Sequence, residues 1–230
     1  MTIKVAIIGA GRMGSIVGKQ LPAEVEKLII DTDEVKAKAL AEAIGGSYAL
    51  ELSAAADADV IDVVLPTPAV NPVMDQLADI AKDGAILMNM ATSAYVDEDI
   101  RKKNPKIEIV DTKIIGHAMS MSQGAPCYVV VKTDHQETFD TIQKILPGYK
   151  KVVQGDADVV STINSIGSGE GIRAAVKVRK LLKPYNIPKE WEDIVIYTVC
   201  AGTMRSYVEN DLGHFARELA DKLEAEESQD

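Results

Sequence analysis

Three glycines and one carboxylate near the amino terminus have the spacing that most directly suggests chemistry. Gly9, Gly11 and Gly14 follow the pattern G-x-G-x-x-G, and Asp31 lies 17 residues after the last glycine. Such glycines allow a tight turn, admit a diphosphate close to the backbone and let a helix pack on a strand, while the acid accepts a hydrogen bond from a ribose hydroxyl. Because N–H groups at a helix N-terminus bind phosphate, the pattern predicts a dinucleotide site.

The residues around this pattern refine the prediction. Arg12 and Met13 lie between the second and third glycines, and we expect both to line the cofactor. For Arg12 the alternatives are a phosphate contact and an ordinary surface arginine. Asp31 favours NAD, because its charge would repel the 2′-phosphate of NADP. Lys36 and Lys38 follow closely and keep NADP possible.

Apolar runs that are typical of buried strands alternate with helix-like segments over the first two thirds of the chain. Expected strands cover residues 3–8, 27–30, 60–65, 85–90, 107–115, 127–132 and 150–154. Expected helices follow the glycines to residue 21 and then cover 34–44, 71–81, 97–103 and 135–146. Continuous apolar strands that alternate with helices indicate an α/β fold, a Rossmann-type doubly wound sheet that is mostly parallel.

The pattern changes near Asp156, after which helical spacing dominates. Helices are expected over 158–185, 189–210 and 212–226. We therefore divide the chain into a dinucleotide-binding domain, 1–155, and a small all-helical domain for dimerisation and substrate binding, 156–230. So short a helical segment supports little core of its own, and its helices carry more apolar residues than one face needs. The sequence therefore predicts a homodimer.

Polar residues follow the strands at the edge where ligands of open α/β sheets lie. Leu65 is the last residue of the strand at 60–65, Pro66 and Thr67 follow it, and Thr92 follows the next strand. We expect these four residues to contact the dinucleotide. The alternatives are a plain strand-ending turn for the first three and a helix N-cap for Thr92.

His117 opens a loop of small polar residues after the strand at 107–115. Histidine titrates near neutral pH and can exchange the proton that accompanies hydride transfer, so His117 is a candidate catalytic residue and Ser120 a candidate substrate contact. The alternative is a histidine satisfied by the local backbone. Lys113, at the end of the strand, either assists the reaction or is a solvated lysine.

Asn164, Ser165 and Ser168 are expected at the start of the long helix. There the helix dipole and their polar groups would hold a substrate carboxylate. The alternative is that the neighbouring glycines simply allow helices to pack closely.

Composition limits the partners. Lys and Arg total 25, Asp and Glu total 35, and the formal net charge is −10, which disfavours nucleic acid and anionic membranes. Cys127 and Cys200 are expected to be free buried thiols of a reducing compartment, and no metal-ligand spacing is found. Without a signal peptide or a long apolar run, we expect a cytoplasmic protein that acts on a small molecule.

Three segments, 9–14, 58–66 and 164–169, resemble the pyrroline-5-carboxylate reductase and β-hydroxyacid dehydrogenase superfamily, which includes 6-phosphogluconate dehydrogenase. The resemblance implies an NAD(P)-dependent oxidoreductase with a helical dimerisation part. It would transfer a hydride between nicotinamide and a C=N or C–OH carbon of a small carboxylate metabolite. The matched asparagine, Asn164, is a candidate catalytic residue on this resemblance.

Two departures from that family support a second hypothesis. Matching Asn164 places Ser161 where the hydroxyacid dehydrogenases of the group carry a catalytic lysine. The Ser-Pro-Gly-Gly segment of the reductases is absent. A non-catalytic NAD(P)-binding sensor or regulatory protein is therefore the alternative, because fold alone does not establish chemistry.

Overall fold

The structure is a computed structural model that describes residues 2–228. The chain divides into two compact units, the first ending at Asn164 and the second beginning at Ser165. This division falls later than residue 155, because Ala157, just before the long helix, and Val160, in its first turn, are buried against Val130 of the sheet. Each unit is described by itself below.

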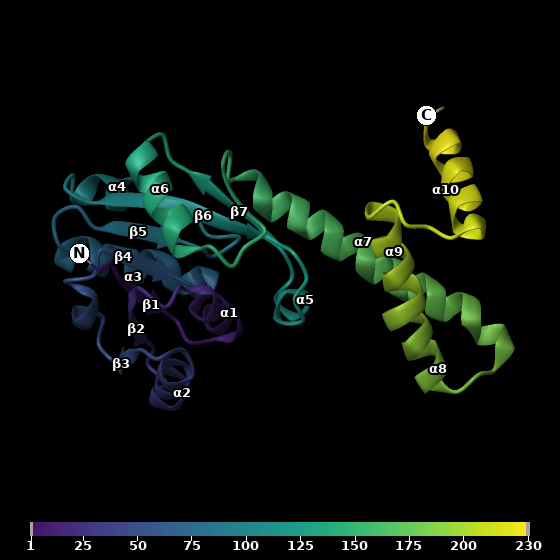
Figure 1. Ribbon diagram of the computed structural model, residues 1–230, viewed down its shortest axis with the longest axis horizontal. Helices are drawn as coiled ribbons and strands as arrows, with labels where there is room; N and C mark the ends of the chain where they lie inside the picture. Colours follow the sequence, from purple (N-terminus) through teal and green to yellow (C-terminus); the bar gives the residue numbers. More distant parts are fainter. Residues whose placement is uncertain (1, 229–230) are drawn as a thin grey trace. The chain divides into compact units, whose positions relative to one another are not determined.

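In the described part of the chain, the first unit is built on an eight-stranded sheet of order β3-β2-β1-β4-β5-β6-β7-β8 (Figure 1). All neighbouring strands are parallel except β6 and β7, which are antiparallel. The strands are β1 Lys4–Ile8, β2 Glu26–Ile30, β3 Ser47–Ala49, β4 Val60–Val63, β5 Ile86–Asn89, β6 Glu108–Ile115, β7 Tyr128–Lys132 and β8 Lys151–Gln154. The expected doubly wound, mostly parallel sheet is confirmed, with its switch point between β1 and β4.

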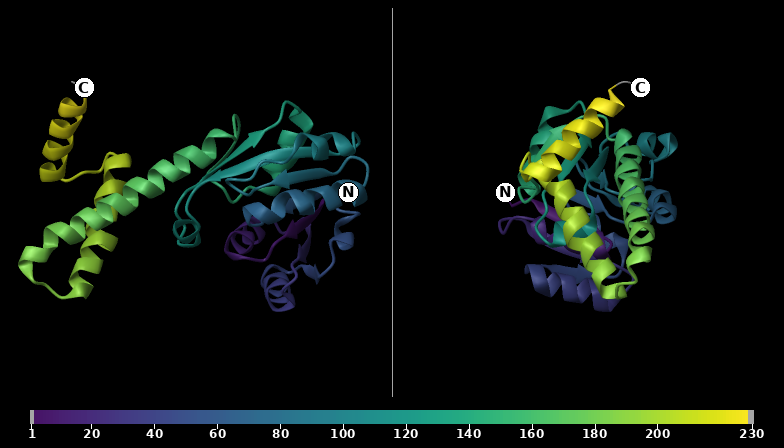
Figure 2. Two further views of the ribbon diagram at one scale, coloured as in Figure 1. Left: turned by 180° about the vertical axis from the view of Figure 1, so that it is seen from behind. Right: turned by 90° about the vertical axis from the view of Figure 1, so that its right-hand side faces the viewer.

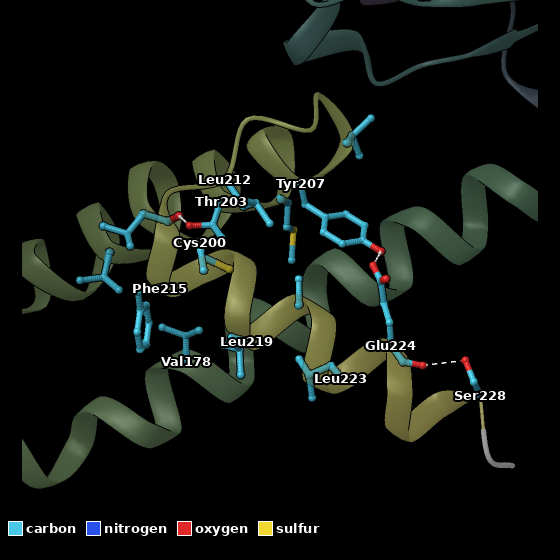
Figure 3. A pocket seen from close by; sticks show the side chains of 16 residues that line it. Val178, Cys200, Thr203, Tyr207, Leu212, Phe215, Leu219, Leu223, Glu224 and Ser228 are labelled. Atoms are coloured by element: carbon cyan, nitrogen blue, oxygen red, sulfur yellow. Dashed lines mark hydrogen bonds between the residues drawn. The ribbon is translucent and has the colours of Figure 1, made fainter.

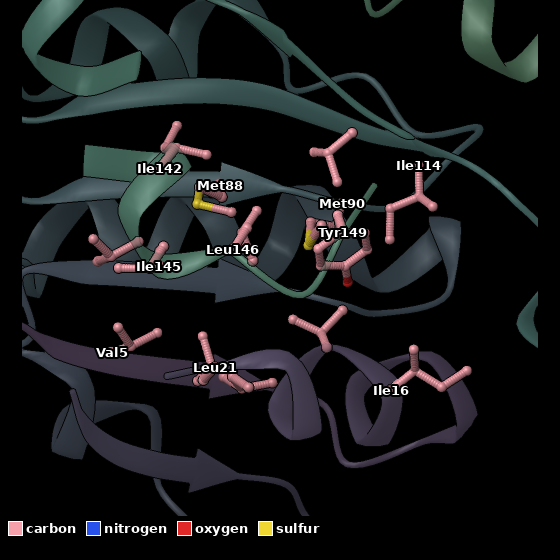
Figure 4. Packing of buried hydrophobic residues seen from close by; sticks show 14 of the residues in the cluster. Val5, Ile16, Leu21, Met88, Met90, Ile114, Ile142, Ile145, Leu146 and Tyr149 are labelled. Carbon is pink, nitrogen blue, oxygen red and sulfur yellow. The ribbon is translucent and has the colours of Figure 1, made fainter. Parts of the chain in front are cut away.

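Helices cover both faces of this sheet, as Figures 1 and 2 show. The helices are α1 Arg12–Gln20, α2 Glu34–Ile44, α3 Thr67–Ile80, α4 Glu98–Lys103, α5 Ala118–Ser122 and α6 Gln136–Ile145, with a 3-10 turn at Leu52–Ala55. One apolar core joins α1, α2 and α6 to the sheet, and a second core joins α3 and α4 to the other face. Figure 4 shows part of the first core, where Ile142 and Leu146 pack near Met88.

Two helices differ from the expectation. Helix α3 begins at Thr67 rather than at residue 71, because Pro68 occupies the first turn, where a missing N–H costs nothing. Pro72 therefore lies inside the helix. Residues 118–122, expected as a loop, form the short helix α5, which His117 precedes as N-cap residue.

Within residues 2–228, three polar side chains inside the first core have an oxygen atom without a hydrogen-bond partner. Asp62 of β4 is 1% exposed, and burial raises the pKa of its carboxyl well above the usual range. Asp62 Oδ1, Thr112 Oγ1 and Tyr149 Oη are the buried side-chain atoms without a hydrogen-bond partner among the residues described. Tyr149 lies near Met90 and Ile114 (Figure 4). An uncompensated buried polar group lowers the stability of the unit.

The second unit is helical, as expected. Its elements are the remainder of α7 Val159–Leu182, a 3-10 turn Lys183–Tyr185, α8 Lys189–Ile194, a π-helical segment Val195–Cys200, α9 Ala201–Val208 and α10 His214–Glu227. Arg179 of α7 forms ion pairs with Glu192 and Asp193 of α8. Cys127 and Cys200 are free thiols; Cys127 is buried, as expected, whereas Cys200 is half-buried.

Two further observations concern the helices and the second unit. Within residues 2–228, no helix combines the length and the apolar composition needed to cross a membrane. No residue of 165–228 is buried, wherever exposure is described. The helical unit therefore forms secondary structure without a core of its own.

Candidate functional site

The glycine loop between β1 and α1 has the shape that the sequence pattern predicts. Gly9 has a φ of +109°, and a Cβ there would lie 2.5 Å from the Val64 carbonyl oxygen. A Cβ on Gly14 would lie 1.8 Å from the carbonyl oxygen of Gly9. A Cβ on Gly11, by contrast, would meet no protein atom within 4 Å. Two glycines therefore close the turn, and the middle one leaves open space above the backbone.

The N-terminus of α1 lies at this open space. Gly11 is the N-cap residue, makes no side-chain cap, and no acidic residue occurs in the first turn. The first N–H groups of the helix are therefore left for an external acceptor, and the helix dipole favours an anion. Arg12 is exposed in this turn, and Met13 packs partly against the core. These residues fit the diphosphate of a dinucleotide.

Asp31 is fixed beside the loop at the end of β2. Its Oδ2 accepts the N–H of Ala10 at 2.7 Å, and its Oδ1 accepts the N–H of Asp33 at 2.8 Å. Each carboxylate oxygen has a further lone pair, and the residue is partly exposed. The carboxylate is thus held in place while it can still accept ribose hydroxyl groups.

Lys36, one of the two lysines that keep NADP possible, forms an ion pair with Asp33. Lys36 Nζ lies 2.7 Å from Asp33 Oδ2. This hydrogen bond raises the pKa of Lys36 and lowers the pKa of Asp33. The charge of Lys36 is therefore already balanced by Asp33, which supports the preference for NAD.

The residues after β4 meet the glycine loop. Leu65 Cδ2 would lie 3.0 Å from a Cβ on Gly9, so Leu65 packs beside the turn. Pro66 and Thr67 are exposed at the start of α3. They belong to a helix N-terminus rather than to a plain strand-ending turn.

Thr92 lies in the loop between β5 and α4. The N-cap of α4 is Asp97, so the N-cap alternative for Thr92 in that helix is wrong. Thr92 is half-buried, and the next residue, Ser93, is exposed. Ser93 Oγ lies 3.2 Å from Ser161 Oγ of α7. No sequence signal linked these two serines, which are far apart in the chain.

Lys113 of β6 is hydrogen-bonded to the backbone of the loop that carries Thr92 and Ser93. Its side chain is 1% exposed, so the alternative of a solvated lysine is wrong. Its Nζ donates hydrogen bonds to the carbonyl oxygens of Ala91 and Ala94, the latter at 2.9 Å. Burial lowers the pKa of Lys113 to about 8, an effect that Asp111, with Oδ1 at 3.5 Å, partly opposes.

Asn89, the last residue of β5, and Asp111, in the middle of β6, complete a buried polar network. Asn89 Nδ2 donates to the Ala94 carbonyl oxygen at 2.9 Å and to Asp111 Oδ1 at 2.7 Å. Arg101 of α4 bonds the other carboxylate oxygen of Asp111. The signal for this network was polar residues inside otherwise apolar strands, and sequence reasoning missed Asn89 and Asp111.

The long helix begins within one residue of the expected range 158–185, but Asn164, Ser165 and Ser168 do not lie at its start. Helix α7 starts at Val159, so Asn164, Ser165 and Ser168 lie inside it. Because backbone N–H groups inside a helix are used by the helix, the predicted carboxylate site at a helix N-terminus is wrong for these residues. The side chain of Asn164 donates from Nδ2 to the Ile114 carbonyl oxygen at 2.9 Å. Ser165 and Ser168 are exposed.

His117 lies directly after β6, at the same edge of the sheet as the ends of β4 and β5. The side chain is exposed, and its Nδ1 lies 3.4 Å from Ser120 Oγ. The structure thus brings together two of the predicted residues, His117 and Ser120. No group of three or more His, Cys, Asp or Glu side chains suited to a metal ion occurs within 2–228.

Comparisons with known proteins agree with this geometry. A family model described as the NAD binding domain of 6-phosphogluconate dehydrogenase matches residues 4–156. No curated protein sequence matches the chain. A solved pyrroline-5-carboxylate reductase from Coxiella burnetii is 15% identical, with a TM-score of 0.73 over 97% of this chain and 85% of the reductase.

Two further solved structures are similar. A 3-hydroxyisobutyrate dehydrogenase from Salmonella typhimurium is 21% identical, with a TM-score of 0.69 over 91% of this chain and 79% of that one. An imine reductase variant from Myxococcus stipitatus, in complex with NAD⁺, is 16% identical, with a TM-score of 0.59 over 91% and 78%. At these identities the likeness shows the fold.

Proposed function

Since the chain belongs to the family of the NAD-binding domain of 6-phosphogluconate dehydrogenase, and with it to the NAD(P)-dependent oxidoreductases, we propose the reaction as follows. The protein transfers a hydride between nicotinamide and a C=N or C–OH carbon of a small carboxylate-bearing metabolite. The observation that carries the proposal is Asp31, fixed by the Ala10 N–H beside the open space above Gly11. That arrangement suits a ribose and a diphosphate in adjacent positions.

Residues along the carboxyl edge of the sheet hold the cofactor. NAD, when bound, supplies or accepts the hydride. The N–H groups at the start of α1, with Arg12 and Met13, hold the diphosphate, and Asp31 holds the adenosine ribose. The segment from Leu65 to Thr67 and, beyond it, Thr92 line the rest of the dinucleotide.

His117 donates or accepts the proton that accompanies hydride transfer. In reduction, its imidazolium gives a proton to the nitrogen or oxygen that gains the electron pair from the attacked carbon; in oxidation, the neutral imidazole takes that proton. Ser120, hydrogen-bonded to the ring, orients it and contacts the substrate. Asn164, whose Nδ2 donates to the Ile114 carbonyl oxygen near the end of β6, is the second catalytic residue of the proposal. Ser165 and Ser168 contact the substrate carboxylate through their hydroxyls.

A titration followed by a turnover assay tests this proposal. Nicotinamide fluorescence with NADH and NADPH measures binding and preference, and loss of NADH absorbance with cyclic imines, 2-oxo acids and 3-oxo acids measures turnover. His117→Ala should lower turnover by about 100-fold or more, as expected for a lost general acid, with NADH affinity unchanged. His135→Ala, in which an exposed ring pairs with Glu108, is the matched control. Unaltered turnover in His117→Ala would remove this residue from the mechanism.

One observation favours the second candidate, a non-catalytic NAD(H) sensor. Ser161, at the position of the family's lysine, presents a hydroxyl that lies 3.2 Å from Ser93 Oγ. Unlike the side chain of a catalytic lysine, a serine hydroxyl is a poor proton donor and acceptor at neutral pH. Tight NADH binding without turnover on any member of the panel would support the sensor.

The helical part, residues 156–230, is proposed to form a homodimer and to contribute to substrate binding, with residues 1–155 binding the dinucleotide. A groove of about 1400 Å³ in the second unit is lined mainly by apolar side chains, among them Val199, Phe215 and Leu219 (Figure 3). A second copy of the chain would cover these side chains. The two free thiols support action in a reducing compartment such as the cytoplasm.

A further inference from the structure

Lys113 is a buried charge that the proposed chemistry does not yet use. It belongs to β6, near its carboxyl end, and is among the largest side chains that are fully buried. Removing an ammonium ion from water costs several kcal/mol unless hydrogen bonds replace the water. An aliphatic residue would fill the same position without that cost, so the charge requires an explanation beyond packing.

The partners of Lys113 lie at the two ends of one short loop. Its Nζ donates to the carbonyl oxygens of Ala91 and Ala94, and Asp111 Oδ1 lies 3.5 Å away on the third side. Thr92 and Ser93 lie between the two bonded carbonyls. The ammonium therefore fixes both ends of the segment that carries these two hydroxyls.

Asn89 strengthens the same restraint. Its Nδ2 donates to the Ala94 carbonyl oxygen at 2.9 Å, and its Oδ1 accepts the Ala91 N–H at 3.2 Å. With its backbone held from below, the loop leaves Thr92 half-buried and Ser93 exposed toward Ser161. A loop held by charge-assisted hydrogen bonds keeps a side chain in place better than a free loop does.

Strand order places this loop on one side of the dinucleotide. Asp31 follows β2, the glycine loop follows β1, and the order continues through β4 and β5. With the adenosine ribose at β2 and the diphosphate at β1, the second nucleotide extends over the ends of β4 and β5. Neighbouring strands are about 4.8 Å apart, so the loop at 91–94 lies within reach of the nicotinamide half.

We propose that Lys113 is a positioning residue whose ammonium ion holds Thr92 and Ser93 in the arrangement that receives the nicotinamide half of the cofactor. The inference rests on the proposed function, because it needs a dinucleotide along this edge. It assigns Lys113 no contact with the cofactor. A purely structural lysine would stabilise the unit without any preference between the two halves of the dinucleotide.

Calorimetry with two ligands separates these roles. ADP-ribose carries the adenosine, the diphosphate and a ribose but lacks nicotinamide, so it reports the glycine loop and Asp31. In the full-length Lys113→Met variant, NADH affinity should fall by about tenfold or more, as for a loosened site, and ADP-ribose affinity should stay within about twofold of its original value. The fluorescence of bound NADH should also change, since it reports the surroundings of the ring.

Matched variants complete the test. Lys82→Met removes a lysine paired with Asp59 at 2.6 Å and should change neither affinity. Lys113→Gln keeps an N–H donor of shorter reach. If the Met variant does not fold, the Gln variant is tested by the same comparison of its NADH affinity with its ADP-ribose affinity. Equal losses for both ligands, no loss for either, or failure of both variants to fold would overturn the positioning role. Wild-type protein that binds neither ligand would instead overturn the proposed function, and this inference with it.

Discussion

The two units of this chain use apolar residues in opposite ways. In the first, strands such as β1 and β4 are buried on both faces, and side chains such as Ile7 and Ile61 are 0% exposed. In the second, Val208 is 83% exposed and Phe215 is 81% exposed. A parallel sheet with helices on both faces buries its own apolar residues. The comparison therefore separates a unit that is self-sufficient in burying its apolar residues from a helical unit with exposed apolar side chains, for which we propose a partner copy.

The first prediction tests the self-sufficient unit where its packing is tightest. Gly14→Ala places a Cβ 1.8 Å from the Gly9 carbonyl oxygen, so the loop must move, and NADH affinity should fall by more than about 100-fold. The matched variant is Gly11→Ala, whose Cβ meets no protein atom within 4 Å. It should leave the unfolding temperature unchanged and weaken only cofactor binding. Normal NADH affinity in Gly14→Ala would contradict the structure of the loop.

The second prediction tests the need for a partner. Leu219 is 48% exposed and lines the groove of the helical unit. Leu219→Asp would bury a charge in the proposed dimer and should weaken association by about 2–4 kcal/mol. Sedimentation velocity should then detect the variant as a monomer. Val35→Asp, at a 79% exposed position of α2, is the control and should leave the assembly intact. A wild-type chain that is monomeric at all concentrations would contradict the homodimer.

The third prediction concerns the imperfect core of the first unit. Asp62→Val removes a buried carboxyl without a partner for Oδ1 and should raise the free energy of unfolding by about 1–3 kcal/mol at neutral pH. Burial raises the pKa of Asp62 in the folded state. The unfolded chain therefore loses this proton first, and the contribution of Asp62 to the free energy of unfolding falls as pH rises above about 4.

The gain from Asp62→Val should accordingly be smaller near pH 4 than near pH 7. Urea unfolding at both values measures the difference. Asp83→Asn, at an exposed pair with Lys106, serves as the control and should change stability by less than about 1 kcal/mol. A gain that is independent of pH would show that the pKa of Asp62 is not raised in the folded protein.

The sequence predicted those parts of the site that local geometry creates. A tight turn, a helix start and an acid after the next strand are contained in a short segment, so Gly9, Gly14 and Asp31 were found from their spacing alone. The start of α3 at Thr67 was missed because a proline tolerated in a first turn was taken as a strand-ending signal. Asn164 was assigned to a helix N-terminus, but the helix begins at Val159, because Val160 packs on the sheet.

Long-range contacts explain what could not be predicted. The sequence left two interpretations of Lys113, a residue that assists the reaction and a solvated lysine, and only the folded chain shows that its neighbours are the carbonyls of Ala91 and Ala94. The pair Ser93 and Ser161 joins positions 68 residues apart. Spacing along a chain carries no information on such pairs when no regular element connects them.

By itself, the sequence determined the period of each strand and helix, the order of the elements and the glycine turn with its acid, because all of these follow from residues that are close neighbours in the chain. The tertiary structure decided which polar side chains lose their water, which strand ends share an edge, and which apolar helix sides stay uncovered. These depend on what each residue meets across the sheet, and burial acquires its energetic consequences only after distant segments have packed together.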